Sequence, residues 1–591
     1  MIRSHHCGEL SLPQVDQTVT LAGWVASRRD HGGVIFIDIR DRYGLTQIVF
    51  DSEENAQLHA IADRLRNEYV ISITGTVSAR PDESKNPHIP TGSIEIRAKT
   101  LELLNEAIPL PFSIEDEAQA SESLRLEYRY LDLRRPRMQQ LLQLRSQVSH
   151  LTRQYLHEKQ FIEVETPILT KSTPEGARDY LVPSRVNPGD FFALPQSPQL
   201  FKQILMIGGL DRYFQIARCF RDEDLRLDRQ PEFTQIDLEM SFVDREDIIQ
   251  LIEDLIRLIF KETKQIDLPS PFPRLSFEEA MSRYGTDKPD LRFDLPLQDL
   301  CQFATACDFQ VFRRAIESQG MVKALVIPKG ASFTRNRIDN LIETAKEFGA
   351  KGLAWVKISE DGQLDSSIAK FLNTEDLRNA LPSANPGDLL VFVADQASVV
   401  HQVLGRLRLL LGEELQLVDR TQWKPLWVID FPMFEYDEAS QRHVALHHPF
   451  TAPHTEDIPL LDSQPLLAKT LAYDLVLNGF ELGGGSIRIH SPSMQEKVFD
   501  LLKISKDEAR EKFGFLLNAL ESGAPPHGGI ALGLDRLMML LGQTESIRDT
   551  IPFPKTQKAQ CLMTHAPSSV DSGQLQELSI RTTAKKPAPS P

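Results

Sequence analysis

The stretch HGGIALGLDRLMMLL, residues 527–541, says most about how this chain folds. Glycines come first, then Asp535 and Arg536, then an apolar run of good helix formers. Glycine allows a backbone to lie flat against a ligand, and Arg536 would place a fixed cation at the start of the helix. The pattern suits a nucleotide site that has no P-loop. A buried strand-to-helix turn with a structural arginine is the alternative interpretation.

A second segment predicts a charged hairpin. The stretches YFQIARCFRDED (residues 213–224) and QPEFTQIDLEM (residues 230–240) alternate like two strands joined by a charged loop. Because side chains alternate along a strand, Arg221 and Glu223 would share one face at the strand end. A solvated hairpin tip is the alternative, and further charges in the same loop make it the weaker one.

A third segment, YDLVLNGFELGGGSIR at residues 473–488, contains an Asn-Gly pair between apolar alternations, which predicts a two-residue turn. The resulting register sets Asp474 opposite Gly483 and makes Asp474 and Glu481 diagonal neighbours on one face. Two carboxylates so placed suit an Mg²⁺ ion that carries nucleotide phosphates, whereas an exposed acidic hairpin is the alternative. Arg488 follows at an odd offset, which a bulge in the glycine run could absorb.

Two shorter patterns add candidate polar groups. Gln199 and Lys202 stand three residues apart after a proline-containing loop, so they would share one face of a helix. His447 and His448 are adjacent, but no third metal ligand stands nearby in the sequence. A packed or hydrogen-bonded histidine pair is therefore favoured over a metal site.

The N-terminal 105 residues predict a small β-barrel. Five apolar alternations flank one helical stretch at 53–66, and that order is typical of an OB-fold, a frequent binder of single-stranded nucleic acid. The expected strands are 18–25, 34–39, 45–50, 70–77 and 93–103.

Beyond the barrel the sequence changes character several times. An acidic hinge with prolines at 109–120 precedes a helix over 140–155. From about residue 290, helical patterns alternate with short apolar strands at 322–327, 353–358 and 389–394, which predicts an inserted α/β domain. The expected divisions are 1–105 (barrel), 106–138 (hinge), 139–288 with 423–565 (catalytic domain), 289–422 (insertion) and 566–591 (C-terminal extension with a disordered tail).

Composition limits the class of protein. The chain is 41% hydrophobic and 25% charged with a formal net charge of −17, so any RNA contact must come from local basic surfaces. No apolar run approaches the ~20 residues of a membrane helix, so no membrane partner is expected. The scattered cysteines form no C-x-x-C pair, which argues against a disulfide framework or zinc site and favours the cytoplasm.

Taken together, these motifs resemble the class II aminoacyl-tRNA synthetases. Pro167 within FIEVETPIL (residues 161–169), the Arg221/Glu223 hairpin and the element at 533–536 are similar to the three signature motifs of that family, in its order. The barrel resembles the subgroup of aspartyl, asparaginyl and lysyl enzymes, and the insertion resembles its bacterial aspartyl type. The implied fold is multidomain: an OB-fold β-barrel, an antiparallel-sheet catalytic domain and an α/β insertion. Gln160 departs from the glycine that the family often has there, which should affect only a turn.

The resemblance implies a two-step reaction in which ATP, with Mg²⁺ as cofactor, activates L-aspartate, and the aspartyl group then passes to the 3′ end of tRNA. It implies these roles. Catalysis falls to Arg221, Glu481 and Arg536. Aspartate is bound by Glu175, Ser197, Gln199, Lys202, Arg221, Asp237, His447, His448 and Arg488. ATP is bound by Arg221, Asp222, Glu223, Gln230, Phe233, Glu481, Gly533, Leu534, Asp535 and Arg536. The metal is held by Asp474 and Glu481.

For the tRNA, the resemblance points to the barrel as the anticodon reader. The expected contacts are Arg28, Arg29, His31, Phe36 and Gln47, which combine cations, an aromatic platform and an amide. On its own, Phe36 would more often be a core residue. His31 stands where strictly tRNA(Asp)-specific enzymes tend to carry leucine, and it resembles relaxed enzymes that also charge tRNA(Asn) and depend on a separate amidotransferase. The motif around Pro167 implies a homodimer.

Other interpretations stay open at this point. A strictly tRNA(Asp)-specific enzyme is one, and a sister enzyme for asparagine or lysine is another. Lys202 with Arg488 would form a pocket for an anion, and asparagine would be rejected because it leaves these buried cations unpaired. A non-catalytic tRNA-binding paralogue is the third, and it should lack Arg221, Glu481 or Arg536, all of which are present.

Overall fold

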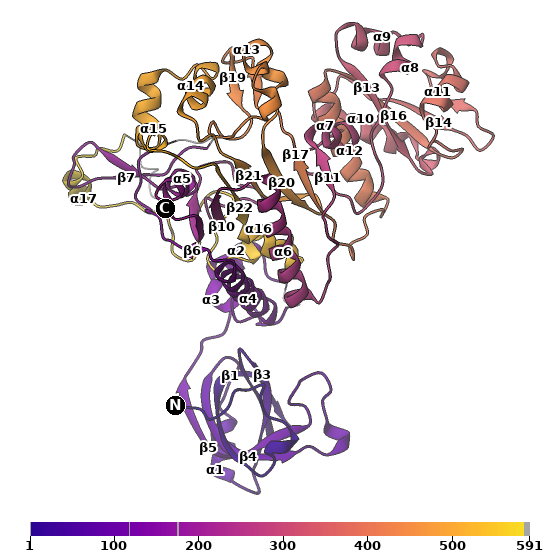
Figure 1. Ribbon diagram of the computed structural model, residues 1–591. Helices are drawn as coiled ribbons and strands as arrows, with labels where there is room; N and C mark the ends of the chain where they lie inside the picture. Colours follow the sequence, from indigo (N-terminus) through magenta and orange to yellow (C-terminus); the bar gives the residue numbers. More distant parts are fainter. Residues whose placement is uncertain (1, 117–118, 174–176, 584–591) are drawn as a thin grey trace. The chain divides into compact units, whose positions relative to one another are not determined.

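The computed structural model describes residues 2–116, 119–173 and 177–583 (Figure 1). They form two compact units: Met1–Gln143 with Arg548–Ser568, and Leu144–Ile547 with Ser569–Pro591. No described helix is long and apolar enough to cross a membrane.

The first unit contains the predicted barrel, which closes in the strand order β1-β2-β3-β5-β4. All five predicted strands form. The predicted helix is shorter than expected because the Asn55 side chain accepts a hydrogen bond from the Leu58 amide at 2.9 Å and so caps the helix start. The bounds are β1 Thr18–Asp30, β2 Val34–Asp41, β3 Gly44–Asp51, α1 Ala56–Ala62, β4 Val70–Ala79 and β5 Ile94–Asn105.

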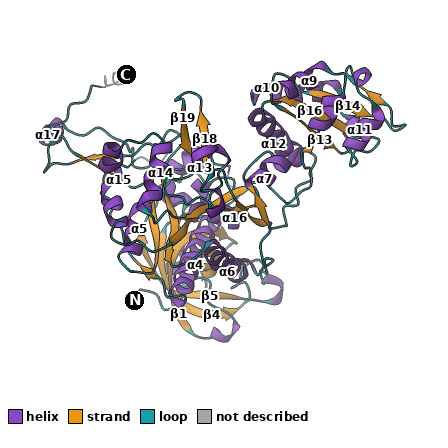
Figure 2. Ribbon diagram, turned by 45° about the horizontal axis from the view of Figure 1, so that its top comes forward, coloured by secondary structure: helices purple, strands orange, loops and turns teal. Residues whose placement is uncertain are grey.

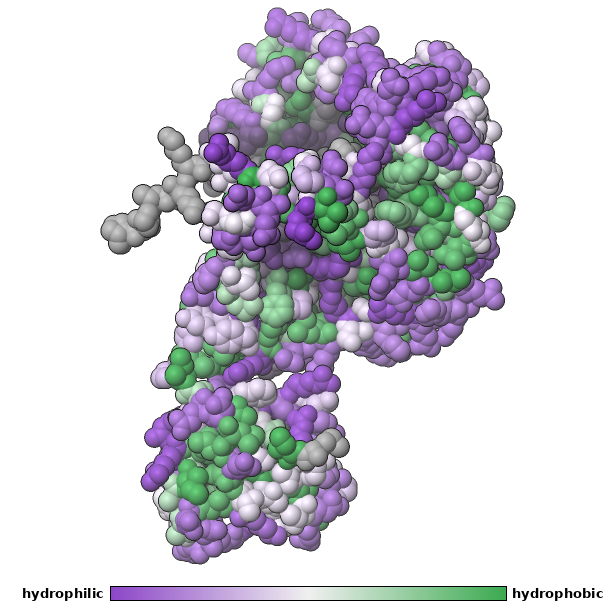
Figure 3. Space-filling model, turned by 90° about the vertical axis from the view of Figure 1, so that its left-hand side faces the viewer, coloured by the Kyte–Doolittle hydropathy of each residue, from purple (hydrophilic) through white to green (hydrophobic). Residues whose placement is uncertain are grey.

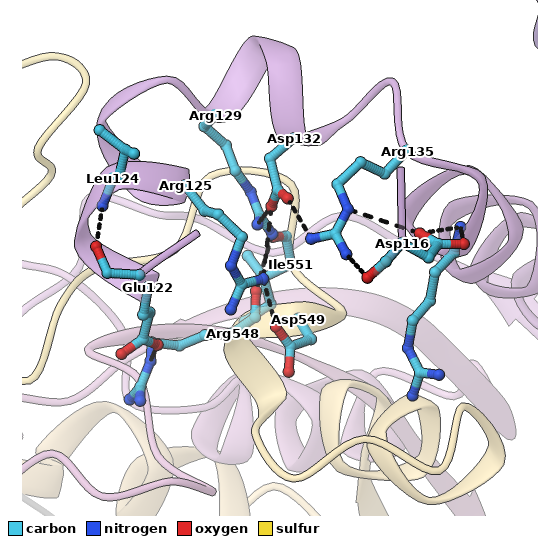
Figure 4. Close-up of polar contacts among 12 residues, drawn as sticks. Asp116, Glu122, Leu124, Arg125, Arg129, Asp132, Arg135, Arg548, Asp549 and Ile551 are labelled. Carbon is cyan, nitrogen blue, oxygen red and sulfur yellow. Dashed lines mark hydrogen bonds and ion pairs between the residues drawn. The ribbon is translucent and has the colours of Figure 1, made fainter. Parts of the chain in front are cut away.

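The hinge part of the first unit, with the short helices α2 (Glu122–Glu127) and α3 (Arg129–Asp132), is held by buried arginines (Figure 4). The Arg129 guanidinium donates to the carbonyl oxygens of Arg548 and Ile551 at 3.0 and 2.9 Å and to that of Pro552 at 2.9 Å. Asp132 pairs with Arg129 and is fully buried. These bonds fasten the segment 548–568 to the hinge.

The second unit is built on an eight-stranded sheet in the order β11-β17-β20-β21-β22-β10-β9-β6. Its central strands pair antiparallel, and only β6 and β11 at the edges pair parallel. The helices α6 (Arg245–Lys264) and α16 (Leu534–Leu541) lie against the sheet and bury their apolar faces in its main core (Figure 2). The strand bounds are β6 Ile162–Glu163, β9 Arg212–Phe220, β10 Glu232–Ser241, β11 Arg274–Ser276, β17 Pro425–Ile429, β20 Ala472–Leu477, β21 Phe480–Ile487 and β22 His527–Gly533.

Further helices and two small sheets complete this part of the chain. The predicted helix over 140–155 forms as α4, which spans the boundary between the units. The bounds are α4 Pro136–Glu158, β7 Leu181–Pro183, β8 Phe191–Ala193, α5 Gln199–Ile207, α6 Arg245–Lys264, α7 Phe277–Tyr284, β18 Phe434–Asp437, β19 Arg442–Ala445, α13 Leu460–Ser463, α14 Pro492–Leu501, α15 Lys506–Leu520, α16 Leu534–Leu541 and α17 Ser572–Glu577.

The segment between α7 and β17 folds as the predicted α/β insertion. Its five strands pair antiparallel in the order β12-β13-β16-β14-β15, with a separate apolar core on each face. The bounds are β12 Gln298–Asp299, α8 Cys301–Ala306, α9 Gln310–Glu317, β13 Met321–Ile327, α10 Arg335–Glu347, β14 Ala354–Ile358, β15 Leu364–Asp365, α11 Thr374–Ala380, β16 Leu389–Asp395 and α12 Ala397–Glu414.

One predicted register is wrong. The turn at Asn478 forms, but Asp474 pairs with Gly484 rather than Gly483, because β21 has an extra residue, Leu482, opposite the step from Leu475 to Val476. The bulge is therefore on the strand that carries the glycine run, directly before Gly483, and this agrees with the bulge that the odd offset of Arg488 suggested there.

Gln160 lies in a turn, as expected, with φ at 65°. Its amide donates to the His157 carbonyl at 2.9 Å, and the Phe161 amide donates to that of Leu156 at 2.9 Å. This is the left-handed ending of a helix, where glycine is favoured.

Candidate active site

An open cavity of about 530 Å³ lies over the middle of the eight-stranded sheet. Most of the predicted site residues line it: Ser197, Gln199, Lys202, Arg221, Glu223, Gln230, Phe233, Asp237, His447, His448, Asp474, Glu481, Arg488, Gly533, Asp535 and Arg536. Asp222 and Leu534 are not on its wall. Leu534 is 1% exposed in the main core, and Asp222 forms a bridge with Arg178. The predicted Glu175 lies outside the described residues.

Lys202, Arg488 and Asp237 line the floor of the cavity, and the buried Glu239 contacts both cations without lining it. The Lys202 Nζ lies 2.7 Å from Asp237 Oδ1 and 3.4 Å from Glu239 Oε2. Arg488 donates from Nε and Nη2 to the two Glu239 oxygens at 2.9 and 3.2 Å, and from Nη1 to Ser486 Oγ at 2.7 Å. Such bidentate pairing fixes the plane of the guanidinium.

This pairing corrects the expected basis for rejecting asparagine. Asparagine would not leave Lys202 and Arg488 unpaired, because each cation already has a carboxylate partner. The four charges balance, and the discrimination must have another physical basis.

The ionisation of the network follows from its burial. Burial raises the pKa of Asp237, whose Oδ2 has no hydrogen-bond partner among the described residues. Burial acts the same way on Glu239, but the charges of Arg488 and Lys202 outweigh it and hold the pKa of Glu239 below its usual value. Glu239 is therefore the carboxylate that anchors both cations.

Strand alternation explains this arrangement. Asp237 and Glu239 are two residues apart on β10, so both point to the face of the sheet on which Lys202 and Arg488 lie. Gly529 of β22 pairs with Glu239 of β10. A Cβ atom added to Gly529 would lie 2.1 Å from both Glu239 Oε2 and the Leu238 carbonyl oxygen. The glycine leaves room for the Glu239 side chain.

The charged hairpin supplies a second wall. The Arg221 guanidinium lies 5.0 Å from the centre of the Phe233 ring, in a cation–π contact. Glu223 pairs with Arg229 at 3.0 Å. The hairpin therefore presents an aromatic ring, a cation and a carboxylate to the cavity.

The element that opened the sequence argument forms the third wall, and β22 leads directly into α16. Asp535 accepts a hydrogen bond from the Thr234 amide at 2.7 Å and pairs with Arg145 at 2.6 Å, so it ties the start of the helix to β10. Arg536 donates to the Glu481 carbonyl oxygen and to Asp228 at 3.3 Å. Arg536 is thus held over the cavity, and the structure favours a site over a purely structural turn.

The Asn-Gly hairpin brings Asp474 and Glu481 to the same cavity. Asp474 is 7% exposed, and its Oδ1 has no hydrogen-bond partner among the described residues. His447 Nε2 lies 3.8 Å from Asp474 Oδ2. Burial, with the charge of Glu481, raises the pKa of Asp474 to about 6.

These carboxylates fit a magnesium ion that also binds a nucleotide. Mg²⁺ usually takes one or two protein carboxylates and completes its shell with phosphate oxygens and water. The unpartnered buried oxygen of Asp474 is a ligand of that kind. No group of three His, Cys, Asp or Glu side chains in the described part of the chain is arranged to hold a metal without such help.

The sequence did not predict the cavity residues Ser486, Asp228, Phe277 and Asp287, or Glu239, which contacts two cavity residues, Lys202 and Arg488. Glu239 could have been found, because it lies two residues beyond Asp237 in the same alternating strand. Phe277 and Asp287 are far from every recognised motif, so the sequence offered no indication of them.

On the barrel, four of the five predicted anticodon residues form one chain of contacts. Arg29 donates to both Asp38 oxygens at 2.8 and 3.1 Å and to Gln47 Oε1 at 3.0 Å. Arg29 pairs with Phe36 across the strands, and the half-buried Phe36 ring meets His31 edge-on at 5.7 Å. Phe36 is thus outside the barrel core, which favours the stacking role.

Arg28 does not share this face. It is opposite Ile37, a core residue, and its side chain pairs with Asp30 at 3.2 Å and with Asp63. Alternation along β1 sends the two neighbouring arginines to different faces.

Two family models match the chain. Residues 121–557 match the tRNA synthetases of class II (D, K and N), and residues 19–104 match the OB-fold nucleic acid binding domain.

Curated relatives are similar over nearly their whole length. The aspartate–tRNA(Asp/Asn) ligase of Desulfatibacillum aliphaticivorans is 56% identical over 584 residues, covering 98% of each chain. The aspartate–tRNA ligase of Geobacillus kaustophilus is 56% identical over 585 residues, covering 98% of this chain and 99% of its own.

Solved structures share the fold. The asparaginyl-tRNA synthetase of Pyrococcus horikoshii, complexed with asparaginyl-adenylate, superposes with a TM-score of 0.60 at 20% identity, covering 94% of this chain and 99% of its own. A putative aspartyl-tRNA synthetase from Leishmania major Friedlin gives a TM-score of 0.58 at 20% identity, covering 93% of each chain.

Proposed function

The chain belongs to the class II tRNA synthetases of the D, K and N group, and on that premise we propose that it is an aspartate–tRNA ligase that charges both tRNA(Asp) and tRNA(Asn). The observation that carries the amino-acid assignment is the pair of buried cations, Lys202 and Arg488, fixed on the floor of the cavity. A buried guanidinium and ammonium offer charge-assisted hydrogen bonds to a side-chain carboxylate.

We assign the aspartate contacts by chemistry. Lys202 and Arg488 bind the side-chain carboxylate, while Asp237 and the neighbouring His447 and His448 orient it. The ammonium group is bound by polar groups at the start of α5 and in the preceding loop, namely Ser197, Gln199 and Glu175.

The nucleotide contacts lie toward the other walls. Arg221 bridges the α-phosphate and the substrate α-carboxylate, where negative charge is concentrated. Phe233 and Arg536 stack on the two faces of the adenine, and Glu223, Gln230 and the backbone at Gly533 hold the rest of ATP. Asp474 and Glu481 hold Mg²⁺, which when bound supplies positive charge beside the phosphates.

The chemistry then needs mainly positioning and charge stabilisation. The α-carboxylate of aspartate attacks the α-phosphorus in line and pyrophosphate leaves. The 3′-terminal ribose hydroxyl of tRNA then attacks the carbonyl carbon of the aspartyl-adenylate, loses its proton, and AMP leaves. Holding the two reactants in line can supply a large part of the rate enhancement, roughly 7–11 kcal/mol. Arg221 stabilises charge that develops on the α-phosphate.

Aspartate-dependent exchange of radioactive pyrophosphate into ATP tests the activation step. We expect exchange with L-aspartate and at most traces with L-asparagine or L-lysine. Exchange that depends on asparagine or lysine would assign the chain to a sister enzyme, and no exchange with any amino acid would support the tRNA-binding paralogue.

The tRNA range rests on His31, which is exposed beside Phe36 at the turn between β1 and β2. Aspartylation of purified tRNA(Asp) and tRNA(Asn) tests it directly. We expect both to be charged, and we expect His31→Leu to reduce charging of tRNA(Asn) more than that of tRNA(Asp). Failure of the unaltered protein to aspartylate tRNA(Asn) would leave a strictly tRNA(Asp)-specific enzyme.

The proposal extends to partners and compartment. Hydrophobic residues gather in patches on the face of the molecule seen in Figure 3. Near Pro167, the large apolar side chains of Ile162, Ile168 and Leu169 are 49%, 42% and 52% exposed. Their exposure supports a homodimer through this segment. All five cysteines are free, which suits the cytoplasm. Charging of tRNA(Asn) with aspartate requires an amidotransferase as a downstream partner.

A further inference from the structure

The hairpin that carries Asp474 and Glu481 is held at its turn by both linkers of the inserted domain. The entry linker is the segment 285–297 between α7 and β12, and the exit linker is the segment 415–424 between α12 and β17. On the exit side, the Lys424 amide donates to Asn478 Oδ1 at 2.9 Å, and Asn478 Nδ2 donates to the Gln422 carbonyl at 3.1 Å. On the entry side, a Cβ atom added to Gly479 would lie 3.2 Å from Asp290 Cβ. The two linkers therefore enclose the turn.

The entry linker is in turn fixed to the insertion by a single buried arginine. Arg408 of α12, 1% exposed, donates to the carbonyl oxygens of Asp290, Phe293 and Leu295 at 2.9, 3.0 and 3.0 Å. Three backbone acceptors on one guanidinium leave the linker little freedom to move independently of α12.

The helix before the linker is fixed in the same way. Lys323 of β13, 1% exposed, donates to both the carbonyl and the hydroxyl oxygen of Ser282 in α7 at 2.9 Å. Gly285, at the end of α7, approaches Gly405 of α12 so closely that a Cβ atom would lie 2.9 Å from the Gly405 amide nitrogen. The insertion thus holds α7 and the entry linker in fixed positions.

The segment formed by α7 and the entry linker also reaches the active-site cavity. Phe277 at the start of α7 and Asp287 in the linker both line it, beside Asp474, Glu481 and His447. Asp287 is half-buried and forms no ion pair with any described residue. Burial raises the pKa of Asp474 and lowers that of His447, whereas their mutual contact acts in the opposite direction on each. The charges of Glu481 and, more weakly, of Asp287 raise both pKa values.

We propose that Asp287 is a further positioning residue of the magnesium–nucleotide site, a third carboxylate beside Asp474 and Glu481 that the inserted domain holds in place. This rests on the proposed use of ATP with Mg²⁺. The buried, unpartnered oxygen of Asp474 points to a cation at this end of the cavity, and a third negative charge increases the attraction for it. The insertion then acts on the first reaction step through α7, the entry linker and the hairpin turn.

The test measures metal binding rather than turnover. Mn²⁺ replaces Mg²⁺ in the full-length protein with a non-hydrolysable ATP analogue, and free Mn²⁺ is followed by electron paramagnetic resonance. We expect Asp287→Asn to weaken Mn²⁺ binding by about fivefold, as expected for loss of one charge near a divalent cation in a hydrated pocket. Asp287→Glu should retain most of the affinity, and the aspartate KM should change little.

Asp294→Asn is the matched control, because it removes the same charge from an exposed position on the same linker, away from the cavity wall. It should bind Mn²⁺ like the unaltered protein. Equal affinity in Asp287→Asn and the unaltered protein would overturn the inference. If the unaltered protein itself fails to bind Mn²⁺ with the ATP analogue, the proposed function fails instead.

The role of the insertion is tested by a second variant. Lys323→Met removes the contact with α7 from inside the insertion, at a distance from any substrate. We expect it to weaken Mn²⁺ binding in the same direction as Asp287→Asn, and the double variant to be no weaker than the Asp287 variant alone. Fully additive effects, or no effect of Lys323→Met in a folded protein, would refute the claim that the insertion acts through Asp287.

Discussion

Replacing Arg488 by leucine gives the sharpest test of the proposed aspartate pocket. Arg488 is 4% exposed, and its loss leaves Glu239 with only Lys202 at 3.4 Å, a lysine already bound to Asp237 at 2.7 Å. Breaking a buried pair by removing one partner costs about 3–5 kcal/mol. The unfolding free energy should fall by that order.

Activity should fall by a comparable amount for a separate reason. The substrate carboxylate loses a buried, charge-assisted partner, and a loss of about 3–5 kcal/mol corresponds to a factor of roughly 10²–10⁴ in kcat/KM for aspartate. ATP contacts none of these groups in the proposed arrangement, so its binding should persist. Pyrophosphate exchange at varied aspartate and equilibrium dialysis of ATP measure the two effects.

Two further variants separate folding from recognition. Glu239→Gln combined with Arg488→Leu removes the unpaired charge, so stability should recover in part while exchange stays low. Arg218→Leu removes a surface arginine that pairs with Glu232 at 2.7 Å outside the cavity, and it should change stability by less than about 1 kcal/mol and leave exchange intact. Near-normal exchange in Arg488→Leu, or its recovery in the double variant, would refute the pocket assignment.

Three more predictions follow from backbone and charge. Gln160→Gly should raise the unfolding free energy by about 1 kcal/mol in urea titrations, because φ at 65° disfavours a side chain; a loss of stability would contradict this. Gly529→Ala should lower the unfolding free energy by at least about 1–3 kcal/mol and raise the aspartate KM, because the new Cβ would lie 2.1 Å from Glu239 Oε2. The control Gly514→Ala in α15, with open space around it, should leave the unfolding free energy unchanged or raise it. Burial would raise the pKa of Glu239, but Arg488 and Lys202 hold it below its usual value, so Glu239 stabilises the folded state above about pH 4.3 and this contribution is lost as the pH falls. The unfolding free energy measured in urea should therefore change less between pH 7 and pH 4 in Glu239→Gln than in the unaltered protein. Equal changes would argue against the pairing.

Local patterns predicted the elements well. Alternation gave the barrel strands, and the Asn-Gly pair gave the turn between β20 and β21, because both depend on neighbouring residues alone. The register beyond the turn was wrong because the bulge at Leu482 depends on packing between strands: a Cβ atom on the next residue, Gly483, would lie 2.2 Å from the Ala531 carbonyl oxygen of β22.

The site was predicted where motifs carry the residues and missed where tertiary contacts do. Arg221, Arg488 and Arg536 stand in recognisable segments, so their meeting in one cavity could be expected. Leu534 sits between two cavity residues in the sequence, but the first turn of α16 directs it into the core. Asp287 lines the cavity from the segment between α7 and the inserted domain, far in sequence from Asp474 and Glu481, and no local pattern encodes that placement.

Selection of aspartate over asparagine needs a different basis from an excess of positive charge. Lys202, Arg488, Asp237 and Glu239 sum to zero charge, so attraction by net charge is weak. What the network fixes is the direction of its remaining donors, because Glu239 and Ser486 orient the guanidinium and Asp237 orients the ammonium. A carboxylate can accept from both cations. An amide must turn its NH₂ group toward one of them, which loses a charge-assisted bond worth about 1.5–3 kcal/mol and sets donor against donor. A site built to hydrogen-bond a substrate group rejects the analogue without it by roughly 10⁴–10⁵, so fixed donor geometry in a neutral network is sufficient for this discrimination.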